Sequence, residues 1–343
     1  MPRTALLRQW VQELFAPDFP GWDAHIEAAS ADASFRRYFR LRLPDQTTRI
    51  VMDAPPEQED CRPFIAVATL FQAAGAHVPE VQAKDLEQGF LLLADLGSTT
   101  YLTALQNSSA ATRLYGDANQ ALLAIQLASR PGVLPEYDHA LLSRELALFP
   151  DWYLGRHLGV AVDQPMQTTL QTVFAAILAN NLKQPQVFVH RDYHSRNLML
   201  VGDPEPTFPS NPGILDFQDA VYGPLTYDPV SLYRDAYISW PEELELDFVI
   251  RYWEAARQAG LPVPADFHDF YRDYEWMGAQ RQLKVLGIFA RLCHRDGKDA
   301  YLADMPRVLG YLRRTCKRYS ELRPLARLLD SVENRQVEVG YSF

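Results

Sequence analysis

Three polar side chains in the middle of the chain follow short apolar segments, at a spacing that could support acid–base and metal chemistry. Asp192 lies just beyond an apolar run over 187–189, which predicts a buried strand. Asn197 follows five residues later, and Asp216 ends a second apolar segment that starts at Gly213. A carboxylate can accept a proton from a hydroxyl group, and Mg²⁺ prefers carboxylate and amide oxygens. This stretch therefore predicts a general base next to a metal site.

The order of these parts is typical of protein-kinase-like phosphotransferases, which carry a His-Arg-Asp loop with Asn at plus five and then an Asp-Phe pair. Phosphoryl transfer from ATP depends mainly on positioning and charge neutralisation. We therefore assign Asp192 as the catalytic carboxylate, and Asn197 and Asp216 as Mg²⁺ ligands. A second His-Arg-Asp sequence at 294–296 has Tyr301 at plus five and follows a helical pattern. We interpret that copy as a solvated helix end.

Composition limits the possible partners. The chain has 343 residues, 48% of them hydrophobic, and a net charge of −10. The acidic balance argues against a nucleic-acid partner, whose phosphates require a basic surface. Neither a signal peptide nor a membrane-spanning stretch is expected, and no obligate protein partner is evident. The cysteines show no metal-ligand or disulfide spacing, so we expect a reducing cytoplasm; they are Cys61, Cys293 and Cys316.

The pattern of the remaining chain predicts an α+β protein with a bilobal, protein-kinase-like fold. A small β-sheet-rich N-lobe over residues 1–95 would bind the nucleotide, and a larger, mostly helical C-lobe over 96–343 would carry the catalytic loop and the substrate site. The N-lobe is expected to contain helices over 4–15 and 57–74 and hairpins over 34–54 and 81–93.

The predicted nucleotide site departs from the kinase pattern at two points. The loop over 31–37, which would lie over the phosphates, contains no glycine, although its backbone amides and the Ser34 hydroxyl could still contact phosphate. The return strand lacks the usual Lys, and Asp53 lies near that position. Arg36 or Arg37 is the candidate replacement, because guanidinium can bind phosphate through two parallel hydrogen bonds. An ordinary surface loop remains the alternative.

The strand that ends near Leu93 would lead into the hinge between the lobes, where backbone amides read adenine in kinase-like folds. Leu93 to Asp95 are the expected hinge. The complete set of expected nucleotide-binding residues is Ser34, Phe35, Arg37, Met52, Leu93 and Asp95.

The C-lobe offers several candidate substrate contacts. Residues 141–153 place charges before an aromatic pair, a combination that could bind a sugar or could equally be core aromatics with a solvated Glu. Asp228 precedes a proline and an apolar helix, so it is expected to cap that helix and to brace the catalytic loop. A predicted helix over 267–292 carries Arg281 and Lys284. These cations could meet an anionic substrate, but a solvated helix face is the favoured interpretation.

With its motifs placed, the chain resembles the aminoglycoside-phosphotransferase and choline-kinase group, through residues 190–197, 214–219 and 227–229. Within that group it is most similar to the bacterial anomeric kinases of N-acetylmuramic acid and N-acetylglucosamine in peptidoglycan recycling. This closer similarity is carried by residues 32–38, 51–56 and 149–153.

The resemblance implies that the anomeric hydroxyl of a free amino sugar attacks the γ-phosphate of ATP and gives a sugar 1-phosphate and ADP. A lactyl carboxylate on muramic acid would need a cation, for which Arg144, Arg196 and Arg281 are candidates. The residues expected around the sugar are Glu145, Trp152, Tyr153, His194, Asp219 and Tyr222.

Two other functions remain compatible with the sequence. The acceptor could be an aminoglycoside, choline or another small alcohol; the few carboxylates disfavour an aminoglycoside, while the aromatics leave room for choline. A protein kinase is disfavoured because no Ala-Pro-Glu sequence follows Asp216. The absent Lys and the glycine-free loop would also fit an inactive nucleotide-binding scaffold.

Overall fold

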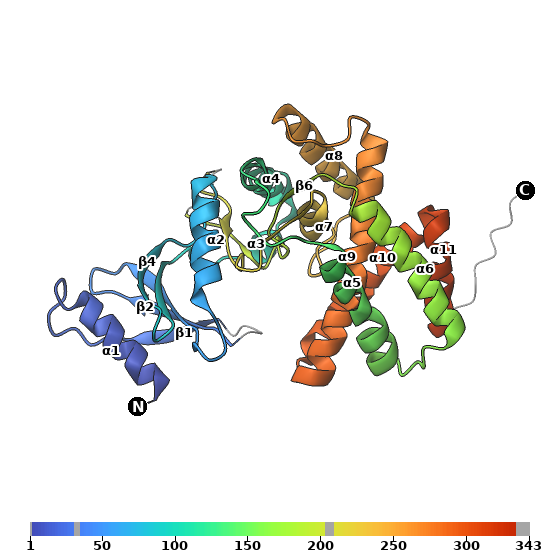
Figure 1. Cartoon of the computed structure of the whole chain (residues 1–343). Helices are drawn as coiled ribbons and strands as arrows, with labels where there is room; N and C mark the ends of the chain where they lie inside the picture. The colour runs from blue at the N-terminus through green and yellow to red at the C-terminus, as the bar shows by residue number, and fades with distance from the viewer. Residues whose placement is uncertain (1, 31–34, 203–208, 334–343) are drawn as a thin grey trace, which may run out of the picture.

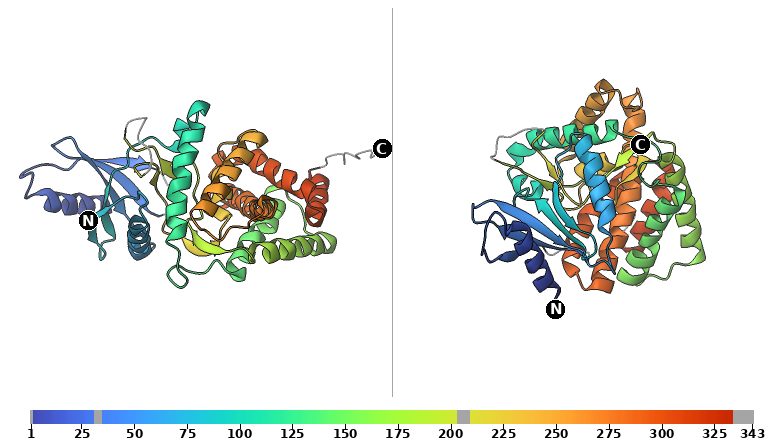
Figure 2. Two further views of the ribbon diagram at one scale, coloured as in Figure 1. Left: turned by 90° about the horizontal axis from the view of Figure 1, so that it is seen from above. Right: turned by 60° about the vertical axis from the view of Figure 1, so that its left-hand side comes forward.

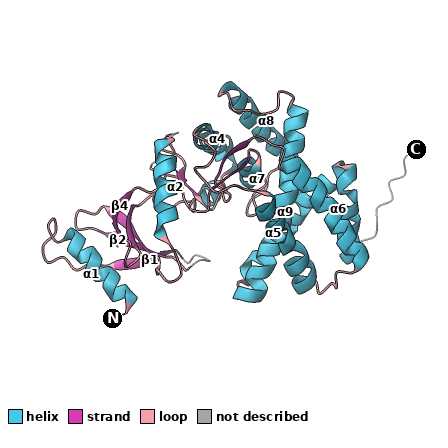
Figure 3. Cartoon of the chain, in the orientation of Figure 1, coloured by secondary structure: helices cyan, strands magenta, loops and turns pink. Residues whose placement is uncertain are grey.

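The computed structural model describes residues 2–30, 35–202 and 209–333. A sheet-rich N-terminal part and a helical C-terminal part lie side by side, and α1 and α11 lie at opposite ends of the molecule in Figures 1 and 2. Longer strands gather at the N-terminal end, as Figure 3 shows, whereas helices make up most of the remainder. This arrangement confirms the expected α+β, bilobal, protein-kinase-like fold.

The N-lobe is built on a five-stranded antiparallel sheet in the order β1-β2-β3-β5-β4. Both expected hairpins are present, and their register sets Arg37 opposite Asp53 and Ile50 opposite Leu93. The strands are β1 (Ile26–Ser30), β2 (Arg37–Arg42), β3 (Thr48–Asp53), β4 (Val81–Asp85) and β5 (Phe90–Ala94).

Two helices cover the sheet, because alternate residues of each strand point to opposite faces. On β5, Phe90 and Leu92 belong to the core under α1 (Arg3–Phe15), while Leu91 and Leu93 belong to the core that includes α2 (Cys61–Ala73). Helix α2 begins at Asp60, whose side chain accepts a hydrogen bond from the backbone N–H of Arg62. The sheet is thereby buried on both faces.

The C-lobe is assembled around α9 (Phe267–Asp296), a 30-residue helix that is buried almost continuously from Tyr274 to Gly287. Gly287 lets α9 approach the end of α5, where an added Cβ would lie 2.6 Å from the carbonyl oxygen of Leu148. The surrounding helices are α3 (Tyr101–Ala104), α4 (Ala111–Leu127), α5 (His139–Leu148), the π-helix η2 (Phe149–His157), α6 (Gln164–Asn181), α7 (Tyr227–Tyr233), α8 (Glu242–Gln258), α10 (Met305–Arg318) and α11 (Arg323–Val332), with 3-10 turns η1 (Ser108–Ala110), η3 (Asp299–Asp304) and η4 (Ser320–Leu322).

Two small antiparallel sheets carry the predicted catalytic stretch. Strand β6 (Gln186–Val189) pairs with β9 (Val221–Pro224), and β7 (Leu198–Met199) pairs with β8 (Gly213–Ile214). The loop between β6 and β7 and the loop between β8 and β9 therefore lie next to each other. This confirms the expected strand-loop-strand arrangement around Asp192 and Asp216.

Other expectations about the fold have mixed outcomes. The second His-Arg-Asp sequence lies at the exposed end of α9, as expected. The expectation that Asp228 caps a helix is wrong, because Thr226 is the N-cap of α7 and makes no side-chain capping bond. Part of the proposed surface insertion at 202–212 lies outside the described residues. Among the helices that the structure describes, none is long and apolar enough to cross a bilayer.

Candidate active site

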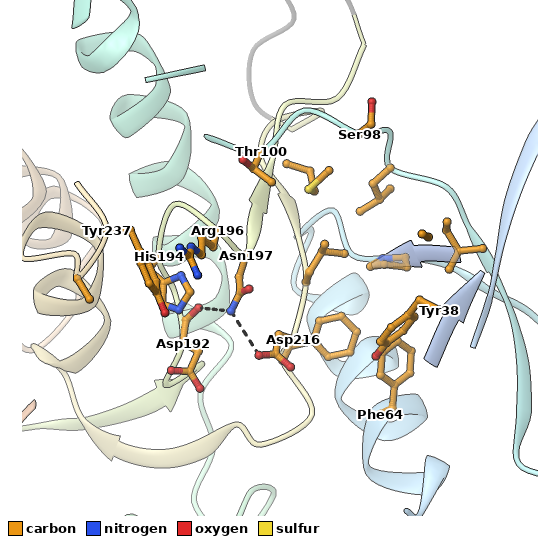
Figure 4. A pocket seen from close by; sticks show the side chains of 18 of the residues that line it. Tyr38, Phe64, Ser98, Thr100, Asp192, His194, Arg196, Asn197, Asp216 and Tyr237 are labelled. Carbon is orange, nitrogen blue, oxygen red and sulfur yellow. Dashed lines mark hydrogen bonds between the residues drawn. The ribbon is translucent and has the colours of Figure 1, made fainter. Parts of the chain in front are cut away.

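A cavity of about 630 Å³ lies between the N-lobe sheet and the C-lobe helices. Figure 4 shows its order: Tyr38 and Phe64 at the N-lobe end, Asp216 and Asn197 in the middle, and Asp192 at the C-lobe end. The three residues assigned to catalysis and metal binding thus face one space. They separate an apolar compartment next to the sheet from a compartment lined by α9.

The backbone of the catalytic loop is fixed from below by Asp228. Its carboxylate accepts hydrogen bonds from the backbone N–H of His190 at 2.7 Å and of Arg191 at 3.0 Å. Arg191 has a φ of 78°, a conformation that non-glycine residues rarely adopt without support from their surroundings. The expectation that Asp228 braces this loop is therefore confirmed.

His190 connects the catalytic loop to the strand that leads to Asp216. Its Nε2 lies 3.0 Å from the carbonyl oxygen of Leu215, and its Nδ1 accepts from the backbone N–H of Asp192 at 3.2 Å. This network requires a neutral imidazole that carries its proton on Nε2. Burial lowers the pKa of His190 to about 4, which keeps the ring neutral at physiological pH.

Asn197 and Asp216 form a donor set that suits a divalent cation. The Nδ2 of Asn197 donates to the carbonyl oxygen of Asp192 at 3.0 Å and lies 3.4 Å from Oδ2 of Asp216, as Figure 4 shows. Because the amide nitrogen is engaged in this way, the amide oxygen is left for a ligand. Asp216 has a φ of 61°, in the left-handed region that Asp tolerates better than most residues.

Asp192 is surrounded by cations. Burial acts to raise the pKa of its carboxyl, but Lys284, His194, Arg281 and Arg191 outweigh burial, so the pKa lies below its ordinary value. Asp192 is thus held as a carboxylate, the form that can accept a proton.

Two of these cations correct a sequence-based interpretation. Arg281 and Lys284 are only 4% and 6% exposed, and both line the cavity. The solvated helix face favoured for them is therefore wrong. The middle of α9 is enclosed by neighbouring helices, and its two cations point toward the site because it offers the charges and space that they need.

Glu145 holds two cations of the site. Its Oε1 accepts from Arg191 at 2.5 Å and lies 3.0 Å from Nζ of Lys284, while its other oxygen accepts from the hydroxyl of Tyr137. The Nζ of Lys284 also donates to the hydroxyl of Tyr227 at 2.9 Å. Glu145 is 5% exposed and does not line the cavity. Its contacts are those of a positioning residue.

The other residues expected around the sugar are distributed unevenly. His194 lines the cavity and packs edge-on against Tyr237, with ring centroids 5.3 Å apart. Four others lie outside the cavity lining: Trp152 and Tyr153 on η2, Asp219 after β8 and Tyr222 on β9.

Several lining residues of the C-lobe compartment were missed by sequence reasoning. They follow no motif, and their positions depend on how α9 and the segment after α7 pack. The aromatic ones are Tyr227, Tyr237, Phe289 and Tyr301.

The N-lobe compartment contains part of the expected nucleotide site. Leu93 and Asp95 line the cavity, whereas Met52 is fully buried outside its lining and Phe35 is 63% exposed. Ser34 lies outside the described residues. The walls are apolar, as a site for a planar base requires, and comprise Tyr38, Ile50, Phe64, Leu93, Met199, Leu215 and Phe217.

The hinge is held by an ion pair between Arg40 on β2 and Asp95. Arg40 donates to the two carboxylate oxygens at 2.7 and 3.0 Å, and also to the carbonyl oxygen of Gly97 at 2.8 Å. The Asp95 side chain therefore fixes the hinge. This contact was not anticipated from the sequence, because the two residues are 55 positions apart.

The two arginines proposed to replace the absent Lys have different surroundings. Arg37 pairs with Asp53 and is absent from the cavity lining. Arg36 is 11% exposed in its side chain, and its guanidinium lies 3.8 Å from Oδ1 of Asp216. Arg36 is therefore the arginine that approaches the metal ligands.

A kinase-like fold, a braced carboxylate beside a metal-ligand pair and an apolar base compartment together define a phosphotransferase. In agreement, residues 25–267 match the phosphotransferase enzyme family. Similar solved structures include the choline kinase LicA from Streptococcus pneumoniae, with a TM-score of 0.60 at 12% identity, covering 90% of this chain and 99% of that chain. The ADP-bound aminoglycoside phosphotransferase APH(2'')-Ib has a TM-score of 0.54 at 11% identity, covering 88% of this chain and 97% of that chain.

Curated relatives are much more similar in sequence. A protein of Pseudomonas aeruginosa named N-acetylmuramate/N-acetylglucosamine kinase is 52% identical over 93% of this chain and 93% of its own length. A protein of Neisseria meningitidis with the same name is 48% identical over the full length of both chains. The chain therefore belongs to the N-acetylmuramate/N-acetylglucosamine kinase family within these phosphotransferases. As in kinases generally, ATP and a divalent metal ion are its cofactors.

Proposed function

We propose that this enzyme transfers the γ-phosphoryl group of ATP to the anomeric hydroxyl of N-acetylmuramic acid and N-acetylglucosamine. The observation that carries the proposal is the position of Asp192, between a metal-ligand pair and an aromatic, cationic compartment that is large enough for a sugar. The names of relatives that are 48–52% identical support the same acceptors.

In this reaction Asp192 orients the anomeric hydroxyl and accepts its proton as the sugar oxygen bonds to the γ-phosphorus. The bond from that phosphorus to the β,γ-bridging oxygen breaks, so the products are a sugar 1-phosphate and ADP. The cations that lower the pKa of Asp192 keep its carboxylate ionised before transfer. Lys284 stays paired with Glu145, which holds its charge next to the base.

We propose Mg²⁺ as the divalent ion, bound by the amide oxygen of Asn197 and the carboxylate of Asp216 together with phosphate oxygens. Mg²⁺ commonly takes only one or two protein ligands beside a nucleotide, so this small donor set fits it. When bound, the ion would neutralise charge on the phosphates. Gln218 donates to Oδ1 of Asp216 at 2.9 Å and would orient the carboxylate.

For the phosphates, we now favour Arg36 over the initially proposed Arg37. The support is the 3.8 Å separation between Arg36 and Asp216, compared with the pairing of Arg37 to Asp53 away from the cavity. The adenine would lie between Ile50 and Leu215, at the hinge that begins near residue 95. The free thiols of Cys61, Cys293 and Cys316 fit a reducing, cytoplasmic location.

The sugar would occupy the C-lobe compartment. We propose His194 and Tyr237 as contacts, since a ring edge and an aromatic face suit hydroxyl and C–H groups. Glu145, Trp152, Tyr153, Asp219 and Tyr222 lack this support because they lie outside the lining.

The first experiment is product identification by phosphorus NMR, with Mg-ATP and each sugar in turn. A sugar 1-phosphate is expected from both. Phosphate on another carbon would contradict the anomeric assignment. If neither sugar reacts while choline or an aminoglycoside is phosphorylated, the acceptor assignment is wrong. ATP binding without turnover on any acceptor would favour the scaffold.

A further inference from the structure

Arg281 is a buried cation in the cavity wall that has no fixed counter-ion. It is 4% exposed, its Nε is buried without a hydrogen-bond partner, and it forms no salt bridge with any residue in the described ranges. By contrast, buried Lys284 pairs with Glu145, and buried Arg234 pairs with Glu245 and Glu275. Burying a guanidinium without a close anion is costly, so this position favours an anion that arrives with a ligand.

The surroundings of Arg281 point to the acceptor end of the cavity. It is carried by α9, whose other lining residues include Val285 and Phe289, and not by the N-lobe sheet. Three carboxylates lie nearby, but each has other tasks: Asp192 is the proposed base, Asp228 accepts from the catalytic loop, and Asp235 accepts from the backbone N–H of Ser195 at 2.9 Å. None of them forms a salt bridge with Arg281 in the described structure.

We propose that Arg281 binds the carboxylate of an anionic acceptor, which is the lactyl carboxylate of N-acetylmuramic acid if the proposed function holds. A guanidinium can bind a carboxylate through two parallel hydrogen bonds, and burial strengthens them. The lactyl ether is on C3 and the reacting hydroxyl on C1 of the same ring, so the carboxylate must be met close to Asp192. N-acetylglucosamine lacks this carboxylate, which makes Arg281 a determinant of selectivity.

The other two candidate cations fit this role less well. The guanidinium of Arg196 lies 3.6 Å from the ring centroid of Tyr237, and its residue is exposed at the rim of the cavity. Arg144 is exposed on α5 and does not line the cavity. Arg281 is therefore the candidate that is both buried and in the cavity wall.

The test compares three acceptors: N-acetylmuramic acid, its methyl ester and N-acetylglucosamine. The ester keeps the bulk of the lactyl group but removes its charge. With the unmodified enzyme, kcat/KM for the acid should exceed that for the ester by ~10- to 100-fold, the range for hydrogen bonds to charged groups. Equal values for acid and ester would overturn the proposal without any variant that could misfold.

The variant Arg281→Gln should then remove most of the preference for the acid over the ester. It should also lower the ratio of kcat/KM for N-acetylmuramic acid over N-acetylglucosamine by ~10-fold or more. Arg281→Lys should restore part of that ratio. The control is Arg295→Gln at the exposed end of the same helix, paired with Asp296, which should leave the ratio unchanged.

A purely electrostatic role toward Asp192 would lower kcat for the three acceptors by one factor and leave the ratios intact. A role toward ATP would raise the KM for ATP equally with each sugar. Either result would overturn carboxylate recognition. If the unmodified enzyme phosphorylated neither sugar, the proposed function itself would fail; turnover of both sugars with unchanged ratios would remove this inference alone.

Discussion

The guanidinium of Arg3 on α1 donates to the carboxylate of Asp53 at 2.6 Å, at the strand position where kinases carry their phosphate-binding Lys. Arg37 donates to the other oxygen of the same carboxylate. The position has thus changed from a nucleotide contact to a clamp between α1 and the sheet. Any cation for the phosphates must come from elsewhere, and the charge that would repel them is neutralised by two arginines.

Replacing Asp53 should destabilise the N-lobe. The residue is fully buried, so Asp53→Ala would leave two guanidinium groups without their acceptor and should lower the free energy of unfolding by about 1–3 kcal/mol. Denaturant titration measures this change. Glu57→Ala, at an exposed position before α2, is the control and should change stability by less than about 0.5 kcal/mol. Equal stability of both variants would contradict the clamp.

Asp192→Asn should lower kcat by at least ~10²-fold, the usual range for loss of a general base. The amide cannot accept the hydroxyl proton, although its shape is nearly the same. Binding of ATP, measured by calorimetry, should stay close to that of the unmodified enzyme. Near-normal turnover would remove Asp192 from this role.

Arg36→Ala and Arg37→Ala form a matched pair of neighbouring substitutions. Only Arg36 approaches Asp216, so Arg36→Ala should raise the KM for ATP by roughly tenfold, as loss of a charge-assisted hydrogen bond would do. Arg37→Ala should mainly lower the melting temperature, because its carboxylate partner is structural. Steady-state kinetics and thermal unfolding of both variants decide the assignment, and the reverse pattern would restore Arg37 as the phosphate contact.

Glu145→Gln should reduce kcat with little change in the KM for ATP. Its carboxylate holds Arg191 of the catalytic loop and Lys284 of α9, and the neutral amide would loosen both. A loss of about 10- to 100-fold is expected from a misplaced base. If the KM for the sugar rises instead while kcat is unchanged, Glu145 contacts the sugar as first expected from the sequence.

The acidic limb of the rate profile should reflect the depressed pKa of Asp192. Burial would raise this pKa, but Lys284, His194, Arg281 and Arg191 lower it overall, so the base stays ionised as pH falls toward the ordinary range of an Asp. Removing one cation in Lys284→Met should raise the pKa and move the limb of kcat/KM to higher pH. The profiles of the two enzymes measure the shift; a limb at the same pH in both would contradict the electrostatic coupling.

Much of the active-site core could be predicted from the sequence because its information is local. Strand β6, the loop with Asp192 and Asn197, and the loop with Asp216 are short segments whose apolar strands and polar ends are visible as a pattern. The brace by Asp228 was also expected, although not its place inside α7. Periodicity likewise predicted α1, both hairpins and α2.

The tertiary structure decided which side chains meet across the fold. Arg281 and Lys284 have the charges of a solvated helix face, but enclosure of α9 turns them into buried cations of the cavity. Glu145 lies 139 positions before Lys284, so no local pattern could show that one carboxylate holds the other's ammonium group. The choice between Arg36 and Arg37 depends on strand pleating, because neighbouring residues on a strand point to opposite faces. Sequence alone determined the reaction type, whereas packing determined the charges that surround it.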